Sequence, residues 1–388
     1  MLYPENSEFK ARVEAFKSRM PCDFAIICHL RDIYYLAGTA QPSMLLVPKD
    51  GDPTIFFRMH LEKGEKETWI GDIRQGGVKE ICELIKGGSL VGIEKDVLPV
   101  SIYESILKRI GGDVETTDVT PAILLTRMVK SRYEITMMEE AARISNAGHK
   151  MVRKALVDGI SEIELATEVE YAMRKAGHNG FIHIRRWDGF LHYELIASGE
   201  NLYTPSGFPG ATITGVGLSR AFSYGPSSRK IMRGDLVMVD IGVPYRGYHS
   251  DEARMYVVGS PDKTQIERYS ILLEIYEKVI PMMKPGNKVN DVYGAAFEVI
   301  EEHGYSDWFM GYQQFGVSYL GHGIGIEMNE MPLVTPGVDI ILEEGITIAL
   351  EPKLIVPGWG GVDLEDTFLI TDNGAKFLTY TGRDLAEV

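Results

Sequence analysis

The chain has 388 residues, 45% of them hydrophobic and 24% charged, which is ordinary for a globular protein and excludes a disordered chain. Its 40 Lys and Arg against 55 Asp and Glu give a formal net charge of −15, which argues against nucleic-acid and anionic membrane partners. No apolar run approaches the roughly 20 residues that span a bilayer, and the first residues do not resemble a secretory signal. Three scattered cysteines form no Cys-x-x-Cys pair, so we expect a cytoplasmic protein in a reducing compartment.

The first part of the chain alternates short apolar runs with helical patterns, which predicts a small α/β domain. Four runs bounded by Pro and Gly are predicted as its strands, at residues 24–29, 43–47, 54–57 and 90–93. Further along, Ser131 and Glu134 form a capping box that opens a long helix. We therefore place the first domain at residues 1–123 and the second at residues 124–388, and the length of the chain also favours two domains.

The second domain contains an internal repeat. Two amphipathic helical segments are each bracketed by glycines with the same separation, Gly159 with Gly177 and Gly286 with Gly304. Each segment is followed by an apolar strand that ends in a carboxylate, at Asp240 and at Glu351. The repeat predicts an α+β domain made of two halves related by a pseudo-twofold axis, although a chance match of this quality is an alternative.

The strand that carries Asp240 leads into a predicted hairpin with a second acid, Asp251. We place a two-residue turn at Tyr245-Arg246. This register puts Asp240 and Asp251 directly opposite each other on one face of the sheet, with their Cβ atoms about 5 Å apart. A lone Asp on a strand is more often structural, so the prediction depends on the pairing.

A second predicted hairpin repeats this arrangement with Glu351 and Glu365. The midpoint between these acids falls on Gly358, which suits an odd-length, glycine-rich loop. Facing carboxylates repel each other and are costly to bury. We expect no Lys or Arg in these strands to neutralise the four carboxylates, so a different positive charge is expected between them.

Two divalent cations would balance the four acids, and an imidazole would complete a mixed ligand set. His322 is the candidate, because Gly321 and Gly323 let the backbone approach closely and leave the ring free. Carboxylate oxygens with one imidazole suit Mn, Co, Fe or Zn. Each of the five residues alone could be structural, so the prediction requires all of them to converge. Lys or Arg counterions at the same place would remove the need for metal.

These five residues resemble the ligands of the pita-bread metallohydrolases, a family that includes aminopeptidase P, prolidase, methionine aminopeptidase and creatinase. The resemblance covers the whole chain, including a creatinase-type N-terminal domain. It implies that Asp240 binds one metal, that Asp251 and Glu365 bridge both, and that His322 and Glu351 complete the second. It also implies that a metal-bridging water is the nucleophile, that Glu351 is the catalytic proton shuttle, and that the protein forms a homodimer.

The chain departs from that family at three positions that handle substrate. A second family histidine is replaced by Asn329, a family arginine is replaced by Asp363, and a third expected residue, another histidine, is absent. His183 or His192 could replace a missing imidazole or could be ordinary surface residues. We take Asn329, Asp363 and His192 as candidate substrate-binding residues. Because Asp363 reverses the local charge of an arginine, a cationic substrate group is one hypothesis.

The resemblance implies an exopeptidase that cleaves short peptides, as an Xaa-Pro dipeptidase or an Xaa-Pro aminopeptidase. One alternative is a relative that is not a peptidase and that acts on a small cationic compound. It would be a creatinase-like C–N hydrolase or a lyase that cleaves the C–S bond of dimethylsulfoniopropionate, and the missing histidines favour it. Another alternative is a catalytically inactive interaction module on the same fold, and the complete ligand set counts against it.

Overall fold

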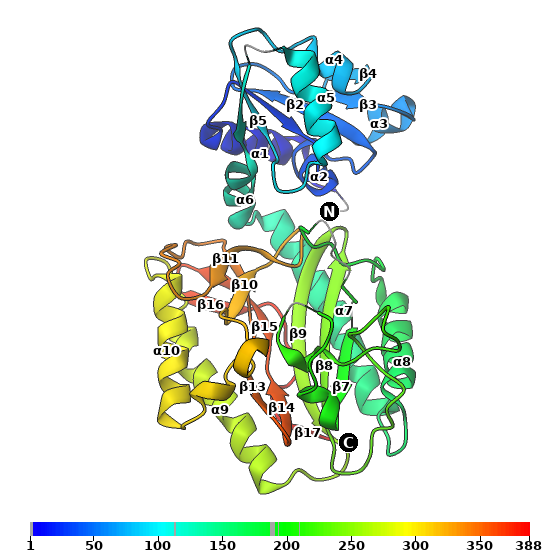
Figure 1. Ribbon diagram of the computed structural model, residues 1–388, viewed down its shortest axis with the longest axis vertical. Coiled ribbons are helices and arrows are strands. Elements are labelled where there is room, and N and C mark those ends of the chain that lie inside the picture. The colour runs from blue at the N-terminus through cyan, green and yellow to red at the C-terminus, as the bar shows by residue number, and fades with distance from the viewer. Residues whose placement is uncertain (1–2, 112–113, 187–190, 193, 209) are drawn as a thin grey trace. The chain divides into compact units, whose positions relative to one another are not determined.

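The computed structural model describes residues 3–111, 114–186, 191–192, 194–208 and 210–388. It divides into two units, which are described separately (Figure 1). One unit comprises Met1–Arg127 and Arg185–Asp188, and the other comprises Met128–Ile184 and Gly189–Val388. Among the described residues, none of the helices has both the length and the apolar character that crossing a membrane requires.

The first unit contains a six-stranded mixed sheet with the strand order β4-β3-β2-β1-β5-β6. Its strands are β1 Phe24–Ile27, β2 Ser43–Pro48, β3 Thr54–Phe57, β4 Asp72–Gln75, β5 Leu90–Ile93 and β6 Glu115–Asp118. The helices are α1 Asn6–Arg19, α2 Leu30–Ala37, α3 Leu61–Glu67, α4 Val78–Cys82, α5 Val100–Ile110 and α6 Thr120–Met128. The four predicted strands are confirmed, with β1 ending at Ile27 rather than at residue 29.

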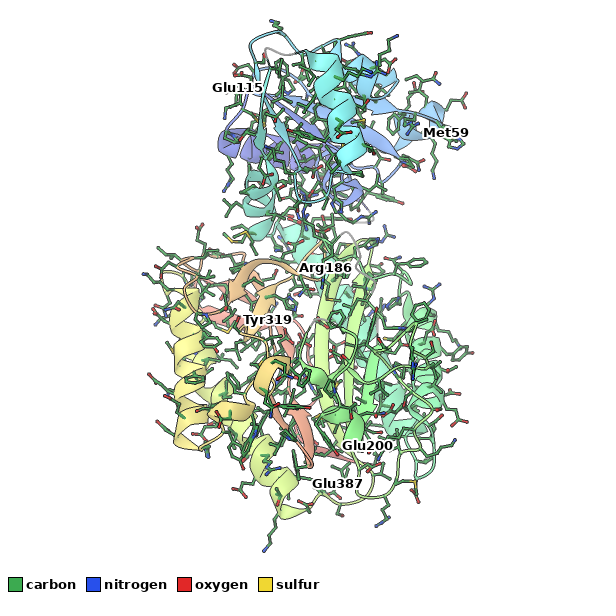
Figure 2. All side chains as sticks on the ribbon, in the orientation of Figure 1. Met59, Glu115, Arg186, Glu200, Tyr319 and Glu387 are labelled. Carbon is green, nitrogen blue, oxygen red and sulfur yellow. The ribbon has the colours of Figure 1, made fainter. Side chains whose placement is uncertain are left out.

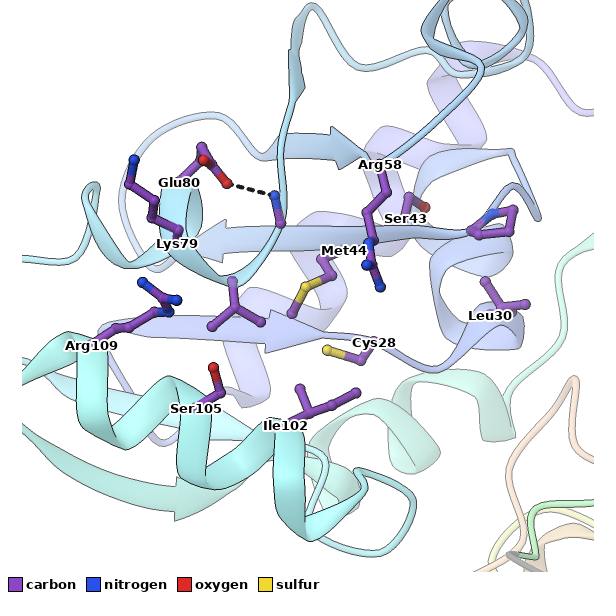
Figure 3. A pocket seen from close by; sticks show the side chains of 13 residues that line it. Cys28, Leu30, Ser43, Met44, Arg58, Lys79, Glu80, Ile102, Ser105 and Arg109 are labelled. Atoms are coloured by element: carbon purple, nitrogen blue, oxygen red, sulfur yellow. Dashed lines mark hydrogen bonds between the residues drawn. The ribbon is translucent and has the colours of Figure 1, made fainter.

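A pocket of about 550 Å³ lies beside helices α4 and α5 of this unit (Figure 3). Its lining includes the apolar side chains of Met44, Val78 and Ile102, and Arg58 and Arg109 reach toward it from different sides. Both arginines are exposed to solvent. None of the predicted site residues lines this pocket, so it is separate from the predicted chemistry.

The second unit contains three sheets, ordered β17-β9-β8-β7, β11-β10-β12-β15-β16 and β13-β14. The strands are β7 Glu194–Ser198, β8 Leu236–Tyr245, β9 Tyr248–Val257, β10 Gly321–Gly323, β11 Glu330–Val334, β12 Thr347–Leu350, β13 Lys353–Val356, β14 Gly360–Asp363, β15 Asp366–Thr371, β16 Gly374–Phe377 and β17 Ala386–Glu387. The α-helices are α7 Arg132–Ala155, α8 Glu162–Ala176, α9 Lys263–Val279 and α10 Val289–Glu302. Short 3₁₀ helices are at Gly199–Leu202, Thr212–Thr214, Ile280–Met282, Ser306–Trp308 and Gln313–Phe315. Within this unit the strands are central, with α7 and α8 on one side and α9 and α10 on the other (Figure 1).

The two halves of this unit begin with equivalent capped helices. The predicted capping box is confirmed at α7, where the Ser131 hydroxyl accepts from the Glu134 N–H and the Glu134 carboxylate accepts from the Ser131 N–H. Helix α9 begins in the same way, with Asp262 and Gln265 exchanging bonds of 2.8 and 3.0 Å. Such caps satisfy N–H groups that a helix start leaves unpaired.

The repeat extends to the segments that precede α8 and α10. The N–H of Gly159 donates to the Ile231 carbonyl at 2.7 Å, and the N–H of Gly286 donates to the Leu342 carbonyl at 2.9 Å. Ile231 lies shortly before β8, the strand that contains Asp240. Leu342 lies shortly before β12, the strand that Glu351 follows. The predicted α+β domain of two repeated halves is therefore confirmed.

The core of the first half fixes the direction of Asp240. Val237, Val239, Ile241 and Val243 alternate along β8 and are buried in one cluster with residues of α7 and α8. Because successive side chains of a strand point to opposite faces, Asp240 faces away from these helices. The acid is therefore directed toward the second half of the unit.

The turn that joins β8 to β9 differs from the predicted one. Tyr245 pairs with Tyr248, so the turn residues are Arg246 and Gly247 rather than Tyr245 and Arg246. Both turn residues have positive φ angles, 50° and 89°. Hairpins favour this turn because its backbone twist matches that of the strands. Glycine adopts a positive φ without a Cβ penalty, whereas the predicted turn would have required a positive φ at Tyr245.

Candidate metal centre

The corrected turn changes how the first two predicted ligands are placed. Asp240 lies opposite Ala253, and Asp251 lies opposite Gly242. The two acids are therefore diagonal neighbours on one face of the sheet, and the prediction that they are directly opposite each other was wrong. Their side chains still lie close together, because each carboxylate affects the pKa of the other.

The second acid pair has the predicted register. The ladder between β12 and β15 ends with Leu350 opposite Asp366, and the ladder between β13 and β14 continues the same register toward a loop centred on Gly358. Glu351 and Glu365 face each other in the interval between these ladders. Burial is nearly complete for Glu365, which is 1% exposed.

His322 lies on β10, between β11 and β12. A Cβ added to Gly321 would lie 2.3 Å from the Ala349 carbonyl oxygen, and one added to Gly323 would lie 2.0 Å from that of Met331. The flanking glycines therefore allow the close backbone approach that the sequence predicted. Nδ1 of His322 lies 3.0 Å from the carbonyl oxygen of Gly323, which can only accept, so the proton is on Nδ1 and the Nε2 lone pair is left for a ligand.

The structure brings all five predicted ligands together. Possible ligand atoms of Asp251, His322 and Glu365 lie within 4.8 Å of one another. Nε2 of His322 is 3.6 Å from Oε1 of Glu351 and 4.0 Å from Oδ2 of Asp251. Asp240 lies near enough to this cluster for the carboxylates of Glu351 and Asp251 to affect its pKa.

The electrostatics of this cluster fit bound cations. Burial, followed by repulsion from neighbouring carboxylates, raises the pKa values of Asp251 and Glu365 well above their usual range. Burial also raises the pKa of Asp240 to about 6. Oε1 of Glu365 is buried without a hydrogen-bond partner among the described residues. Buried polar atoms are normally satisfied, so this oxygen is suited to a metal ion.

The expectation that no Lys or Arg lies near the acids was wrong. Nζ of Lys353 contacts Oε2 of Glu351 and lies 3.1 Å from Oδ2 of Asp363. Asp363 adds a fifth carboxylate, so with all of them ionised a single ammonium group leaves a formal charge of −4. Lys353 therefore does not remove the need for cations, because two divalent ions would balance the remaining charge.

The predicted substrate residues are placed differently from the ligands. Asn329 is exposed in the loop between β10 and β11. His192 packs against Tyr224 with ring centroids 5.7 Å apart, and burial lowers the pKa of His192. Within the described part of the chain, neither has a hydrogen bond or ion pair with a predicted ligand. Asp363 is buried beside Lys353, so its carboxylate is not a free anion. The substrate roles of all three stay predictions, as does compensation by His183.

Three further residues support the site without a signal in the sequence pattern. The Tyr276 hydroxyl, from α9, donates to the Leu350 carbonyl at 2.8 Å where the strand ladder is interrupted. The Thr367 hydroxyl accepts from the Asp251 N–H and donates to the Asp251 carbonyl, each at 2.9 Å. Tyr319, labelled in Figure 2, is largely buried, and burial with the nearby Glu351 carboxylate raises its pKa.

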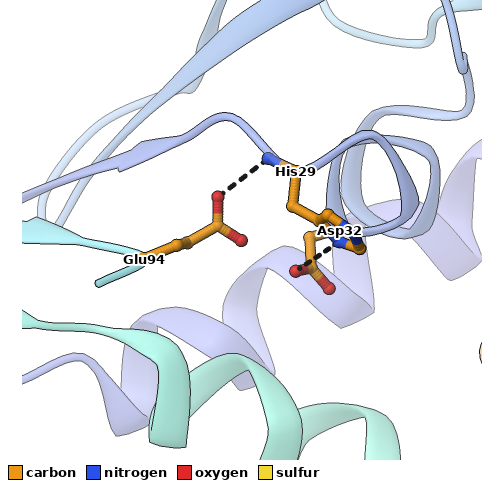
Figure 4. Close-up of side chains that lie close together, drawn as sticks. All are labelled: His29, Asp32 and Glu94. Carbon is orange, nitrogen blue, oxygen red and sulfur yellow. Dashed lines mark hydrogen bonds and ion pairs between the residues drawn. The ribbon is translucent and has the colours of Figure 1, made fainter. Parts of the chain in front are cut away.

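A second group of potential ligands lies in the first unit and consists of His29, Asp32 and Glu94 (Figure 4). Arginines already neutralise it. Arg127 lies 2.7 Å from Asp32, and Arg185 contacts Asp32 and lies 3.3 Å from Glu94. Burial opposes ionisation of Asp32, but Arg127 and the other neighbours outweigh it and lower its pKa. This group therefore differs from the candidate metal centre and is satisfied without a metal ion.

Acid pairs that converge with an imidazole in a duplicated α+β domain form a donor set that suits divalent cations. Residues 136–372 match the metallopeptidase family M24, and residues 11–129 match the creatinase/prolidase N-terminal domain. The chain belongs to metallopeptidase family M24 and is an enzyme of that metal-dependent class.

Solved and curated relatives cover nearly the whole chain. The Xaa-Pro dipeptidase of Pyrococcus furiosus is 32% identical over 95% of this chain and 97% of that protein. The structure of the prolidase from Pyrococcus horikoshii matches with a TM-score of 0.81 at 30% identity, covering 98% of this chain and all of that one. An Xaa-Pro dipeptidase from Bacillus anthracis matches with a TM-score of 0.82 at 27% identity over 98% of this chain and all of that one. The predicted pita-bread fold with its creatinase-type domain is thereby confirmed.

Replacing Gly323 with Ala is expected to weaken metal binding at least tenfold. The added Cβ would collide with the backbone oxygen of Met331, so β10 would have to move and His322 with it. Titration calorimetry with Mn²⁺ would measure the effect. Gly294→Ala in helix α10 is the matched control, because a Cβ there meets nothing within 4 Å. Equal affinities for the two variants would contradict this account of His322.

Proposed function

We propose that the protein is a dinuclear metal-dependent exopeptidase that cleaves Xaa-Pro dipeptides or N-terminal Xaa-Pro bonds. The observation that carries the proposal is the convergence of Asp251, His322 and Glu365, with a buried carboxylate oxygen of Glu365 left unpartnered. Similarity to Xaa-Pro dipeptidases along nearly the full chain supports the substrate class.

The five residues would divide between two divalent cations, which we propose to be Mn, Co, Zn or Fe. Asp240 would bind one cation, Asp251 and Glu365 would bridge both, and His322 with Glu351 would complete the second. When bound, the two cations would activate a water molecule and polarise the scissile carbonyl group. Tyr276 and Thr367 hold the backbone on either side of these ligands, so the acids are fixed before substrate arrives.

Glu351 would carry the proton from the attacking water to the leaving nitrogen. Its carboxylate lies beside His322 and is 9% exposed, so it is available to substrate yet largely shielded from bulk water. General acid–base groups of this kind contribute typically 10² to 10⁴ in rate. The role requires Glu351 to keep a fixed orientation while it takes and releases a proton.

A cytoplasmic, homodimeric enzyme is part of the proposal. Cys22, Cys28 and Cys82 are free thiols, and free thiols persist in reducing compartments. Burial raises the pKa of Cys22 and of Cys82 to about 11, so these thiols are poorly reactive. The homodimer is supported by the family resemblance, and light scattering on the purified protein would test it.

A substrate panel tests the function. Xaa-Pro dipeptides, Xaa-Pro tripeptides, other dipeptides, creatine and dimethylsulfoniopropionate would each be incubated with protein loaded with Mn²⁺, Co²⁺ or Zn²⁺. We expect turnover of Xaa-Pro peptides only, and a loss of about 10³-fold in Glu351→Ala. Turnover of creatine or dimethylsulfoniopropionate alone would favour the alternative functions. Metal-loaded protein that turns over no compound of the panel would contradict the proposal.

A further inference from the structure

Lys353 occupies an unusual position for a lysine, because it is buried next to a predicted metal ligand. Its side chain is 5% exposed, and its Nζ lies between the carboxylates of Glu351 and Asp363. Lys353 therefore presents its ammonium group to both carboxylates at the edge of the candidate metal centre.

The two carboxylate oxygens of Glu351 have different neighbours. Oε1 lies 3.6 Å from Nε2 of His322, on the side where the predicted ligands converge. Oε2 contacts Nζ of Lys353. A carboxylate with one oxygen held by an ammonium group rotates less freely. With Oε2 engaged by Lys353, Oε1 is the oxygen that lies beside His322.

Lys353 is itself held in place from two sides. On the ladder of β13 with β14 it pairs with Asp363, and their side chains form the 3.1 Å ion pair. Asp363 is fully buried, and among the described residues its oxygens have no hydrogen-bond partner with good geometry. Its carboxylate is instead neutralised by the ion pair with Lys353. The backbone of Lys353 is anchored by Met310, whose N–H donates to the Lys353 carbonyl at 2.9 Å.

We propose that Lys353 is a positioning residue of the metal centre, which holds Oε2 of Glu351 so that Oε1 faces the cations, and that Asp363 keeps Lys353 in place. The inference rests on the proposed function for the role of Glu351. Lys353 and Asp363 would thus orient a metal ligand without binding the metal, as residues hydrogen-bonded to metal ligands do in other proteins.

A purely structural role for Lys353 makes different predictions. If Lys353 only neutralises the buried Asp363, then removing both charges together should restore a normal site, because a buried ion pair can often be replaced by neutral groups without loss. In addition, deleting a positive charge beside the metal centre would by electrostatics alone tighten cation binding. Weaker binding therefore points to lost positioning of Glu351.

The experiment compares Lys353→Met, Lys353→Met combined with Asp363→Asn, Lys353→Arg, and Lys376→Met in the full-length protein. Lys376 is an exposed lysine paired with Glu139 on the surface and serves as the control. Mn²⁺ affinity and stoichiometry are measured by calorimetry, and folding is checked by circular dichroism. The double variant does not leave Asp363 as an unpaired buried charge, so it keeps the test valid where the single variant does not fold.

We expect Lys353→Met and the double variant to bind Mn²⁺ 10 to 100-fold more weakly than wild type, within the range for residues that orient metal ligands. We expect Lys353→Arg to recover part of the affinity and Lys376→Met to match wild type. Wild-type affinity in the double variant, or tighter binding in Lys353→Met, would overturn the inference. Because affinity is read without turnover, wild-type protein that binds Mn²⁺ but cleaves no peptide would overturn the proposed function and not the positioning role.

Discussion

Glu365→Gln is expected to lower kcat/KM by about 10³-fold or more and to leave fewer than two bound cations per chain. Glu365 is 1% exposed, and its possible ligand atom lies within 4.8 Å of those of Asp251 and His322. Gln has the same shape but no charge, so it cannot bridge two cations as a carboxylate does. The site would lose its shared ligand while the packing around it is preserved.

Metal analysis by mass spectrometry together with peptide turnover would measure this effect. Glu139→Gln is the matched control, because Glu139 is an exposed glutamate that pairs with Lys376 far from any predicted ligand in the sequence. Two bound cations and wild-type turnover in Glu365→Gln would show that Glu365 is not the bridging ligand.

Bound metal is expected to stabilise the fold by roughly 5 °C or more in Tm, and the gain should grow as pH rises from 5 to 8. In the metal-free protein, burial raises the pKa of Asp240 to about 6 and raises those of Asp251 and Glu365 well above their usual range. An acid whose pKa is raised by folding stabilises the protein below its unfolded value and loses that contribution as pH rises through the folded value. Stability of the metal-free form should therefore fall from about pH 4 upward through pH 6 and above.

Cations reverse this trend because they bind the ionised acids and compete with protons. Melting curves recorded in EDTA and in Mn²⁺ at each pH would give the difference directly, and Glu365→Gln should show a smaller gain than wild type. A metal-induced shift that is equal at all pH values, or larger at pH 5 than at pH 8, would be inconsistent with buried acids as the ligands.

The convergence of the five predicted ligands could be anticipated largely from local patterns in the sequence. The alternation of apolar residues on β8 places Asp240 on the opposite face, and the glycines beside His322 indicate a close backbone approach. The first hairpin was misplaced because two adjacent dipeptides could form its turn. Gly247 was the available signal, since the favoured turn requires positive φ at its second residue.

The ion pair of Lys353 could also have been predicted from the sequence. The register that correctly paired Glu351 with Glu365 also pairs Lys353 with Asp363, so the ion pair follows from it. Other features could not be predicted from local patterns. Strands β4 and β6 lack an apolar run, and Tyr276 reaches the site from a distant helix. Such contacts depend on tertiary packing, which local propensity does not specify.

The central claim is that four acids and one histidine hold two cations. An anomalous-scattering map of crystals grown with Mn²⁺ tests it most directly. We predict two peaks per chain, one beside Asp240 and one beside His322 and Glu351, with Asp251 and Glu365 between them. A map without peaks there, in which Lys353 is the only positive group at the carboxylates, would contradict the account.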